Sequence, residues 1–363
     1  MTIEQTYLVL LRKALGLLAD DPKEGQASPY YEDKSDRLKE VARLNAIQGT
    51  TALLSSDTIV LGRAMMRQQQ QLLTLQKVWS ALEQEGIRPV LLKGLGLARL
   101  YPEPYRRVSS DVDLWVGKGQ YDKVTAILER ELDVEWHHES EEVNERHYNF
   151  NTKQGLIFEI HPQTIPFILP EEKTALETIE LPAMEHAEEF EFEGHIFRMP
   201  EASFNLLFVF MHAWEHFTSS GAGMKHLADL AVLVNNDEWN RQSLHDGLLT
   251  LKKLCLLEPW EVMGYVVVKA FGLNKEQWPG YKDTRRVRRL GERLYKRIME
   301  EGLTRHQTPN TKHRTLNKWI GKMVTLCDRI RTARMIAPYS PQYARHYLYC
   351  AVYKGIRRLR VNE

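Results

Sequence analysis

Two aspartates separated by one residue, Asp111 and Asp113, lie at the start of a short apolar run that ends at Val116. Alternate side chains of a β-strand point to the same face, so these carboxylates would lie side by side, about 6–7 Å apart at their Cα atoms. Two carboxylates at this spacing raise each other's pKa unless a cation lies between them. Mg²⁺ held by one or two carboxylates and substrate phosphates is the usual solution. The spacing therefore predicts a magnesium site.

The elements predicted around this pair form a recognisable order. An apolar strand (Pro89 to Leu92) meets the pair Lys93 and Gly94, a helix-like segment follows (Leu95 to Tyr101), and the second strand carries Asp-x-Asp. This order resembles the core of the DNA polymerase β-like nucleotidyltransferase superfamily. The stretch PVLLKGLGLARLYPEPYRRVSSDVDLWV resembles more narrowly an uncharacterised bacterial nucleotidyltransferase family, often found near surface-polysaccharide or peptide-modification genes. The resemblance covers about 28 residues closely and extends over about 85 to 235.

The resemblance implies a Mg²⁺-dependent reaction that moves a nucleoside monophosphate from a nucleoside triphosphate to an acceptor hydroxyl. The acceptor would be a small molecule, a glycan precursor such as a polysaccharide precursor, or a protein. Two Mg²⁺ ions, about 3.5–4 Å apart, would stabilise the attacking and leaving oxygens. Asp111 and Asp113 would bridge the ions, and the third carboxylate of the superfamily, which comes from a later strand, would be Glu159.

Residues near the glycine turn are expected to bind the nucleotide. Gly94 would let the backbone approach the triphosphate, and the following helix would offer its amides to phosphate. Lys93 and Arg107 are candidate counter-charges, and Ser110 is placed in the same nucleotide-binding set. The sequence departs from the superfamily at Leu95, where a second small residue is usual. A hydroxyl that would contact phosphate is therefore missing from the turn.

The candidate third carboxylate lies in the strand Leu156 to His161, where Glu159 and His161 share one face. A carboxylate in an otherwise apolar strand is costly to bury without a partner. His161 precedes Pro162 at the strand end, where a structural hydrogen bond and a role in the site are both open.

Three further charged positions have two readings each. Arg107 could pair with Glu103 at the surface instead of binding phosphate. Lys225 and Asp229 are four residues apart on a predicted helix and could form an exposed pair. The narrower family resemblance instead implies that a basic residue and an aspartate of this helix border the site.

A rival metal site is suggested by the helix predicted from Glu201 to Phe217, whose residues 212–216 read H-x-x-E-H. This order occurs in inverted zinc metalloproteases. His212 and His216 would lie on one helix face, as two zinc ligands do. A third ligand would have to come from Glu238 or Glu258. The two histidines could instead line the nucleotidyltransferase cleft or serve packing and capping.

The charge of the chain is unevenly distributed although the net charge is +1. Residues 281–363 hold 21 basic and 6 acidic residues, whereas the rest of the chain is acidic. Such a region can contact nucleic acid or pair internally with the acidic part, and the second reading is favoured. Two other functions stay open: a nucleic-acid enzyme that uses this basic region, and a degenerate nucleotide-binding or regulatory module, which the departure at Leu95 favours and the three retained acidic residues oppose.

Composition and length predict an ordinary globular protein. The 363 residues are 43% hydrophobic and 27% charged, which allows two or three domains. Three widely spaced cysteines favour neither a disulfide framework nor a cysteine-based zinc site, which fits the cytoplasm. The first residues are expected to form an amphipathic helix and not a signal peptide, and no apolar stretch is long enough for a membrane span.

The predicted fold is α+β: a nucleotidyltransferase-type mixed sheet at residues 85–200, flanked by helical regions at 1–84 and 201–363, the last basic from about 281. The helices of the core are expected on one side of the sheet. A hairpin is expected from Phe190 to Met199. The other predicted elements are helices at 56–85, 121–131 and 225–230, strands at 134–138, 146–151 and 156–161, and helices beyond Asn240 with breaks near 279, 306–310 and 338–341.

Overall fold

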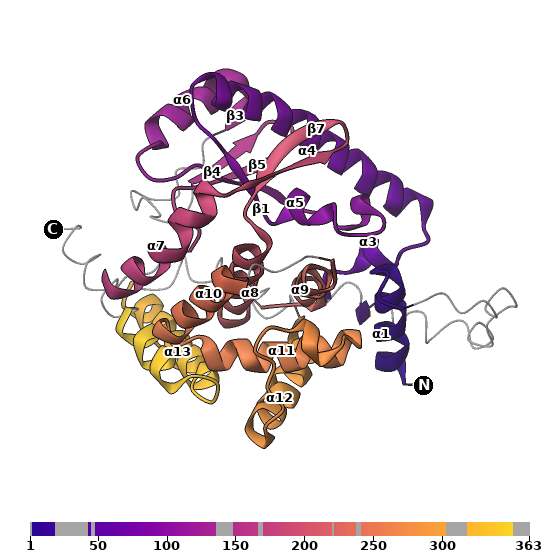
Figure 1. Cartoon of the computed structure of the whole chain (residues 1–363), viewed down its shortest axis with the longest axis vertical. Helices are drawn as coiled ribbons and strands as arrows, with labels where there is room; N and C mark the ends of the chain where they lie inside the picture. The colour runs from indigo at the N-terminus through magenta and orange to yellow at the C-terminus, as the bar shows by residue number, and fades with distance from the viewer. Residues whose placement is uncertain are drawn as a thin grey trace, which may run out of the picture.

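The computed structural model describes residues 2–18, 43–44, 48–135, 148–165, 170–219, 221–236, 241–302 and 318–350. Its architecture is mixed α+β, with a small mixed sheet flanked by helices, which confirms the predicted fold class (Figure 1). Several predicted features lie outside the described residues, namely parts of the helical region 1–84, the strand residues 136–138 and 146–147, Glu238, the break at 306–310 and the residues beyond 350.

The central sheet has five strands in the order β1-β2-β5-β4-β3. Their bounds are β1 Val90–Leu92, β2 Asp111–Trp115, β3 Val134–Glu135, β4 Tyr148–Thr152 and β5 Ile157–His161. Strands β2 and β5 are parallel, and the other neighbouring strands pair in antiparallel fashion. The register places Asp113 opposite Glu159 and Trp115 opposite His161. The candidate carboxylates therefore come from neighbouring strands at the centre of the sheet.

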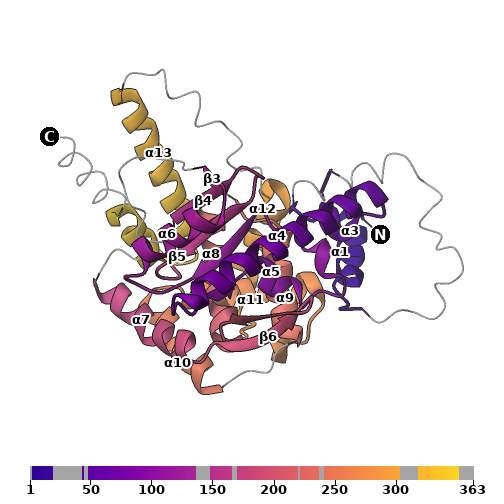
Figure 2. The same cartoon turned by 90° about the horizontal axis from the view of Figure 1, so that it is seen from above.

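The two faces of the sheet are covered by different helices. Val112 and Phe158 pack in one hydrophobic cluster with residues of α4 (Thr58–Gln84) and α6 (Tyr121–Glu131). On the opposite face, Trp115 stacks on Phe204 of α8 (Ala202–Thr218), with ring centroids 5.7 Å apart. Figure 1 shows the sheet between these two helical layers, and Figure 2 shows α4 crossing it from above. The prediction of helices on one side of the sheet is wrong, because the face that carries the carboxylates also presents the apolar Trp115, which α8 covers.

The predicted hairpin is confirmed as β6 (Glu188–Phe192) and β7 (His195–Met199). Glu193 and Gly194 both have positive φ, 51° and 77°, as a two-residue hairpin turn requires. Strand β7 lies beside β1. Helix α7 (Pro170–Glu185) was not predicted, because an internal proline at position 182 and several charged residues interrupt its apolar pattern.

The remaining helices lie mostly in the lower half of the molecule in Figure 1. They are α1 Ile3–Ala14, α3 Thr51–Leu54, α5 Gly94–Ala98, α9 Met224–Asn236, α10 Arg241–Lys253, α11 Leu257–Phe271, α12 Arg285–Glu301 and α13 Lys318–Ile336, with short 3₁₀ helices at Pro104–Arg106 and Lys275–Gln277. Within the described residues, none of the helices is both long and apolar enough to cross a bilayer.

One hydrophobic cluster joins the three regions predicted from the sequence. It contains Tyr7 of α1, Trp115 of β2, Trp214 of α8, Trp260 of α11 and Tyr339 after α13. Core packing therefore passes from the N-terminal helix through one face of the sheet to the C-terminal helices.

Part of the basic C-terminal region pairs with acidic side chains of the same chain. Ion pairs around α12 include Arg286 with Glu258, Arg288 with Asp283 (2.9 Å), Lys282 with Glu261 (2.6 Å) and Arg297 with Glu301 (3.0 Å). These contacts support internal pairing for this part of the charge.

Candidate active site

Neighbouring strands bring two carboxylates together on the face of the sheet that looks toward α8 and α9. Asp113 of β2 is 1% exposed, and the Glu159 side chain, opposite it on β5, is 18% exposed. Both strands are anchored by apolar residues on their other face, such as Val112 and Phe158, so the backbone fixes the spacing of the acidic groups.

Asp113 is held by two nitrogen donors that contact the same oxygen. Lys93 Nζ lies 2.8 Å from Asp113 Oδ1, and His161 Nε2 donates to this oxygen over 2.9 Å. Burial alone would raise the pKa of Asp113, but the Lys93 charge and the His161 hydrogen bond hold it well below its usual value. Asp113 is therefore a buried anion, and His161 has a place in the site.

Glu159 has the opposite electrostatic environment. Burial, followed by the negative charges of Asp113 and Asp111, raises the pKa of Glu159 to about 8, although Lys93 opposes the shift. Its Oε2 lies 3.8 Å from His161 Nε2. In the absence of a further cation, Glu159 therefore carries a proton at neutral pH.

Replacing Glu159 with glutamine is expected to stabilise the metal-free protein at alkaline pH. The folded pKa of about 8 lies above the ordinary 4.5, so the folded state binds the extra proton between these pH values. Wild-type stability should fall as pH rises through this window, and Glu159→Gln should escape that loss, by about 2–4 kcal/mol above pH 8. Urea unfolding in a chelator at pH 5 and pH 8.5 measures the difference.

The matched control for this experiment is Glu185→Gln, which changes an exposed glutamate at the end of α7. It should alter stability by less than about 0.5 kcal/mol at either pH. A Glu159→Gln variant whose advantage over wild type is the same at both pH values would contradict the raised pKa.

Asp111 is positioned by two serines at the start of β2. The Ser109 hydroxyl donates to the Asp111 carbonyl at 2.9 Å and lies 3.2 Å from its Oδ1, and Ser110 donates to Oδ1 at 3.2 Å. Helix α4 holds the backbone of the same loop, since Gln71 Nε2 donates to the Ser109 carbonyl at 3.1 Å. Ser109 and Gln71 were missed by the sequence analysis, and nothing in their local pattern marks them.

The turn between β1 and α5 has an unusual backbone. Lys93 and Gly94 both have positive φ, 47° and 37°, and a Cβ atom at Gly94 would lie 3.0 Å from Ser109 Oγ. A non-glycine residue in this region is strained, and such strain is common at functional sites. Leu95 is 1% exposed and belongs to the core cluster, so its side chain does not fill the turn. Helix α5 ends at Ala98, earlier than the predicted Tyr101.

Arg107 forms a buried ion pair with Asp229 of α9. Arg107 Nε and Nη2 donate to the two carboxylate oxygens at 3.0 and 2.7 Å, and Tyr101 donates to Asp229 Oδ1 at 2.6 Å. Burial disfavours the charged carboxylate, but Arg107 and Tyr101 lower the pKa of Asp229. The surface alternative for Arg107 is wrong, because Glu103 pairs with Arg106 instead, at 2.5 Å.

Lys225 does not form the alternative exposed pair with Asp229, because Asp229 is buried against Arg107. Lys225 is half-buried on the same side of the molecule. Burial and then the charge of Arg107 lower its pKa to about 8, with Asp229 and Asp111 opposing the shift. Lys225 therefore lies within electrostatic reach of both the ion pair and the carboxylate site.

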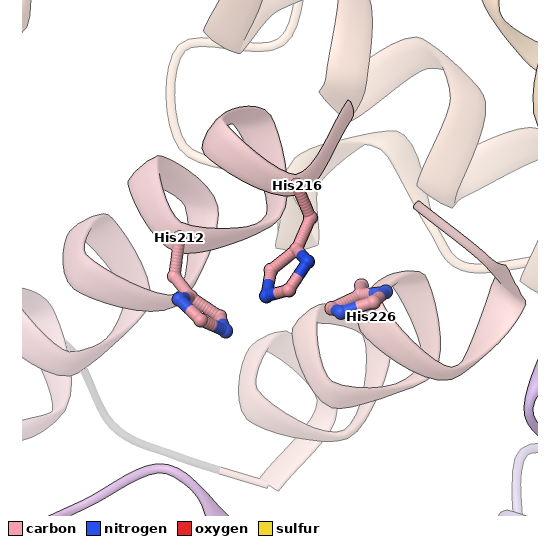
Figure 3. A group of neighbouring side chains, drawn as sticks. All are labelled: His212, His216 and His226. Atoms are coloured by element: carbon pink, nitrogen blue, oxygen red, sulfur yellow. The ribbon is translucent and has the colours of Figure 1, made fainter. Parts of the chain in front are cut away.

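His212 and His216 are joined by His226 of α9, a residue that the sequence analysis did not select as a ligand (Figure 3). The proposed third ligand Glu258 is engaged with Arg286. The signal that could have found His226 is its place near the start of the helix that follows the H-x-x-E-H helix.

The donor set of the carboxylate site fits a divalent cation. One ligand atom each of Asp113, Glu159 and His161 lies within 4.8 Å of the others. Asp111 acts on Glu159 through its charge, although it is not part of this closest group. The two carboxylates offer the oxygen donors that suit Mg²⁺, whereas His161 offers a nitrogen. The raised pKa of Glu159 is expected where neighbouring carboxylates have too little positive charge around them.

A separate hollow of about 190 Å³ lies among α7, α8 and α10. Its lining includes Thr178, His186, Phe204 and Asp246. None of the predicted site residues lines it, so it is distinct from the carboxylate site.

The family comparison covers the part of the chain that builds this site. A family model described as an uncharacterised nucleotidyltransferase matches residues 60–257, which is more than half of the chain. Every predicted site residue, from Lys93 to Asp229, lies inside the match. Searches of curated proteins and of solved structures found no match. The chain therefore belongs to this uncharacterised nucleotidyltransferase family and is a transferase.

Proposed function

We propose that this protein is a Mg²⁺-dependent enzyme that transfers a nucleoside monophosphate from a nucleoside triphosphate to an acceptor hydroxyl. The observation that carries the proposal is that Asp113, Glu159 and His161 of neighbouring strands converge with Lys93 of the turn after β1. The order of strand, strained turn, short helix and Asp-x-Asp strand also supports a DNA polymerase β-like core.

The metal would be held by Asp111, Asp113 and Glu159, and when bound it supplies positive charge to the triphosphate and acidifies the acceptor hydroxyl. His161 keeps the Asp113 carboxylate in place through its 2.9 Å hydrogen bond. The serine contacts described above do the same for Asp111. These residues therefore hold the acidic groups before substrate arrives, which avoids reorganisation during the reaction.

The reaction forms a bond from the acceptor oxygen to the α-phosphorus and breaks the bond from that phosphorus to the bridging oxygen of pyrophosphate. The acceptor proton passes to solvent, because Glu159 already holds a proton at neutral pH in the metal-free protein and would be a metal ligand when the cation is bound. Lys93 is buried at the glycine turn and is suited to act as a counter-charge for the triphosphate. The acceptor class we favour is a small molecule, a glycan precursor or a protein.

Thermal unfolding with ATP, GTP, CTP or UTP, each with and without Mg²⁺, tests the proposal. We expect one triphosphate to stabilise the fold only when Mg²⁺ is present, by about 2.7 kcal/mol at 100 times its dissociation constant. Slow transfer to water should then release pyrophosphate and nucleoside monophosphate in equal amounts.

Asp111→Asn should abolish both effects, whereas Asp122→Asn, which changes an exposed aspartate on α6, should leave both intact. Stabilisation without release of pyrophosphate would instead favour the degenerate nucleotide-binding module. No stabilisation by any of the four triphosphates would count against a nucleoside triphosphate donor.

A further inference from the structure

Three histidine rings from two helices face one another outside the carboxylate site (Figure 3). His212 and His216 lie four residues apart on α8, and His226 lies on the neighbouring α9. The ring centroids of His216 lie 4.5 Å from those of both His212 and His226, and the His212 and His226 centroids are 6.1 Å apart. One nitrogen from each ring lies within 4.8 Å of the other two.

The backbone near the start of α9 is pinned, which fixes the position of His226. Gly223 lies so close to the backbone of Gln48 that a Cβ atom at position 223 would be 2.6 Å from the Gln48 carbonyl oxygen. The Met224 amide donates to Gln48 Oε1 at 2.9 Å, and Gln48 Nε2 donates to the Ile298 carbonyl at 2.8 Å. The third histidine is therefore presented by a rigid helix start, as a preorganised ligand should be.

The exposure of the three histidines, and the hydrogen bonding and pKa of His226, are compatible with metal binding. All three are half-buried, so an ion can reach them while solvent is partly excluded. The Gly223 amide donates to His226 Nδ1 over a long 3.3 Å, which orients the ring and is weak enough to be exchanged. Burial, then the neighbouring His216 and Lys225, lower the pKa of His226, which disfavours the protonated ring. A neutral imidazole is the form that binds a metal.

The chemistry of the cluster selects the kind of ion. Imidazole nitrogens suit zinc, copper, cobalt and nickel, whereas Mg²⁺ and Ca²⁺ prefer oxygen. The neighbouring charges are Lys225 and Arg107, and the carboxylate of Asp229 is already bonded to Arg107 and Tyr101. The positive charges of Lys225 and Arg107 repel a cation that would be held by electrostatic attraction alone, so metal binding would depend on the imidazole nitrogens. The same charges favour an anionic oxygen as an additional ligand of the metal.

We propose that His212, His216 and His226 bind one divalent transition-metal ion of the zinc class, with a fourth position open to water or an anionic oxygen. Three histidines and an exchangeable fourth ligand are a known arrangement for zinc. The site is separate from the Asp113 and Glu159 pair, and it does not depend on the function proposed above.

The test uses the full chain, purified without a polyhistidine tag, stripped with a chelator and titrated with Co²⁺. Co²⁺ with three nitrogen ligands and one further ligand gives a visible absorption band, which Zn²⁺ should abolish by displacement. We expect the band to reach its full intensity with one equivalent of Co²⁺ bound at the three histidines. His226→Ala should weaken binding by more than about 100-fold, since even partners one step removed from a metal cost 10–100-fold when changed.

Two controls separate this site from others. His245→Ala changes an exposed histidine on α10 and should leave the band unchanged. Glu159→Gln changes the carboxylate site, which contains its own histidine, and should also leave the band unchanged. His216→Asn, on the other helix, gives a second test if His226→Ala does not fold, and circular dichroism of the metal-free variants checks folding.

The proposal is overturned if the wild type gives no band, if both histidine variants keep it, or if Glu159→Gln removes it. Inorganic phosphate tests the fourth position, and a shift of the band on its addition is the expected result. An unchanged band at saturating phosphate would refute an open position for an anionic ligand.

Discussion

An Asp113→Asn variant is expected to lose about a thousandfold in nucleotidyl transfer and about 3–5 kcal/mol in free energy of unfolding. The first loss follows because several kcal/mol of charge stabilisation at the reacting phosphate depend on this carboxylate. The second follows because Lys93, whose Nζ lies 2.8 Å from Asp113, would be left as a buried charge without its partner. Pyrophosphate release and urea unfolding measure the two effects.

Asp122→Asn, the exposed change on α6, is again the matched control and should alter neither quantity appreciably. Pyrophosphate release that survives in Asp113→Asn at the wild-type rate would remove Asp113 from the reacting centre. If the substitution leaves the free energy of unfolding unchanged, Lys93 has found another partner. Glu159 is a candidate, since the charge of Lys93 already lowers its pKa.

The second large effect is expected at Asp229, whose carboxylate accepts hydrogen bonds from Arg107 and Tyr101. Asp229→Ala would leave the buried Arg107 guanidinium without its counter-ion, which should cost about 3–5 kcal/mol in free energy of unfolding. Because the pKa of Asp229 is lowered in the folded state, its contribution should be present above about pH 4 and be lost at lower pH. Urea unfolding at pH 7 measures the loss.

A double variant distinguishes a lost ion pair from lost packing. Arg107→Met combined with Asp229→Leu removes both charges, so much of the stability should return. Asp246→Asn, an exposed change on α10, controls for the loss of a carboxylate on a helix. A double variant that is as unstable as Asp229→Ala would show that the shape of the pair, and not its charge balance, matters.

Local patterns predicted most of the elements. Helix α6 has the predicted bounds Tyr121–Glu131, and β5 begins one residue after the predicted Leu156. Alternation along β2 placed Asp111 and Asp113 on one face correctly, because the period of a strand is a local property. These features depend on neighbours in the chain, which a single sequence displays.

The partnerships of the site could not be predicted in the same way. Arg107 and Asp229 are separated by 122 residues, and the sequence suggested a nearer partner for each. His226 was passed over because its ring meets His212 and His216 only after α9 packs against α8. Side chains far apart in the chain are brought together by tertiary packing, which the local periodicity of the sequence does not predict.

The continuous hydrophobic cluster from Tyr7 to Tyr339 has a consequence for the cooperativity of unfolding. A fragment that ended at residue 200 would leave Trp115 and its neighbours in water, because α8 supplies their cover. The strands that hold Asp113 and the helices that hold the three histidines are therefore expected to unfold together. Ligand binding at either place would then raise the melting temperature of the whole molecule, although the two ligands share no contact.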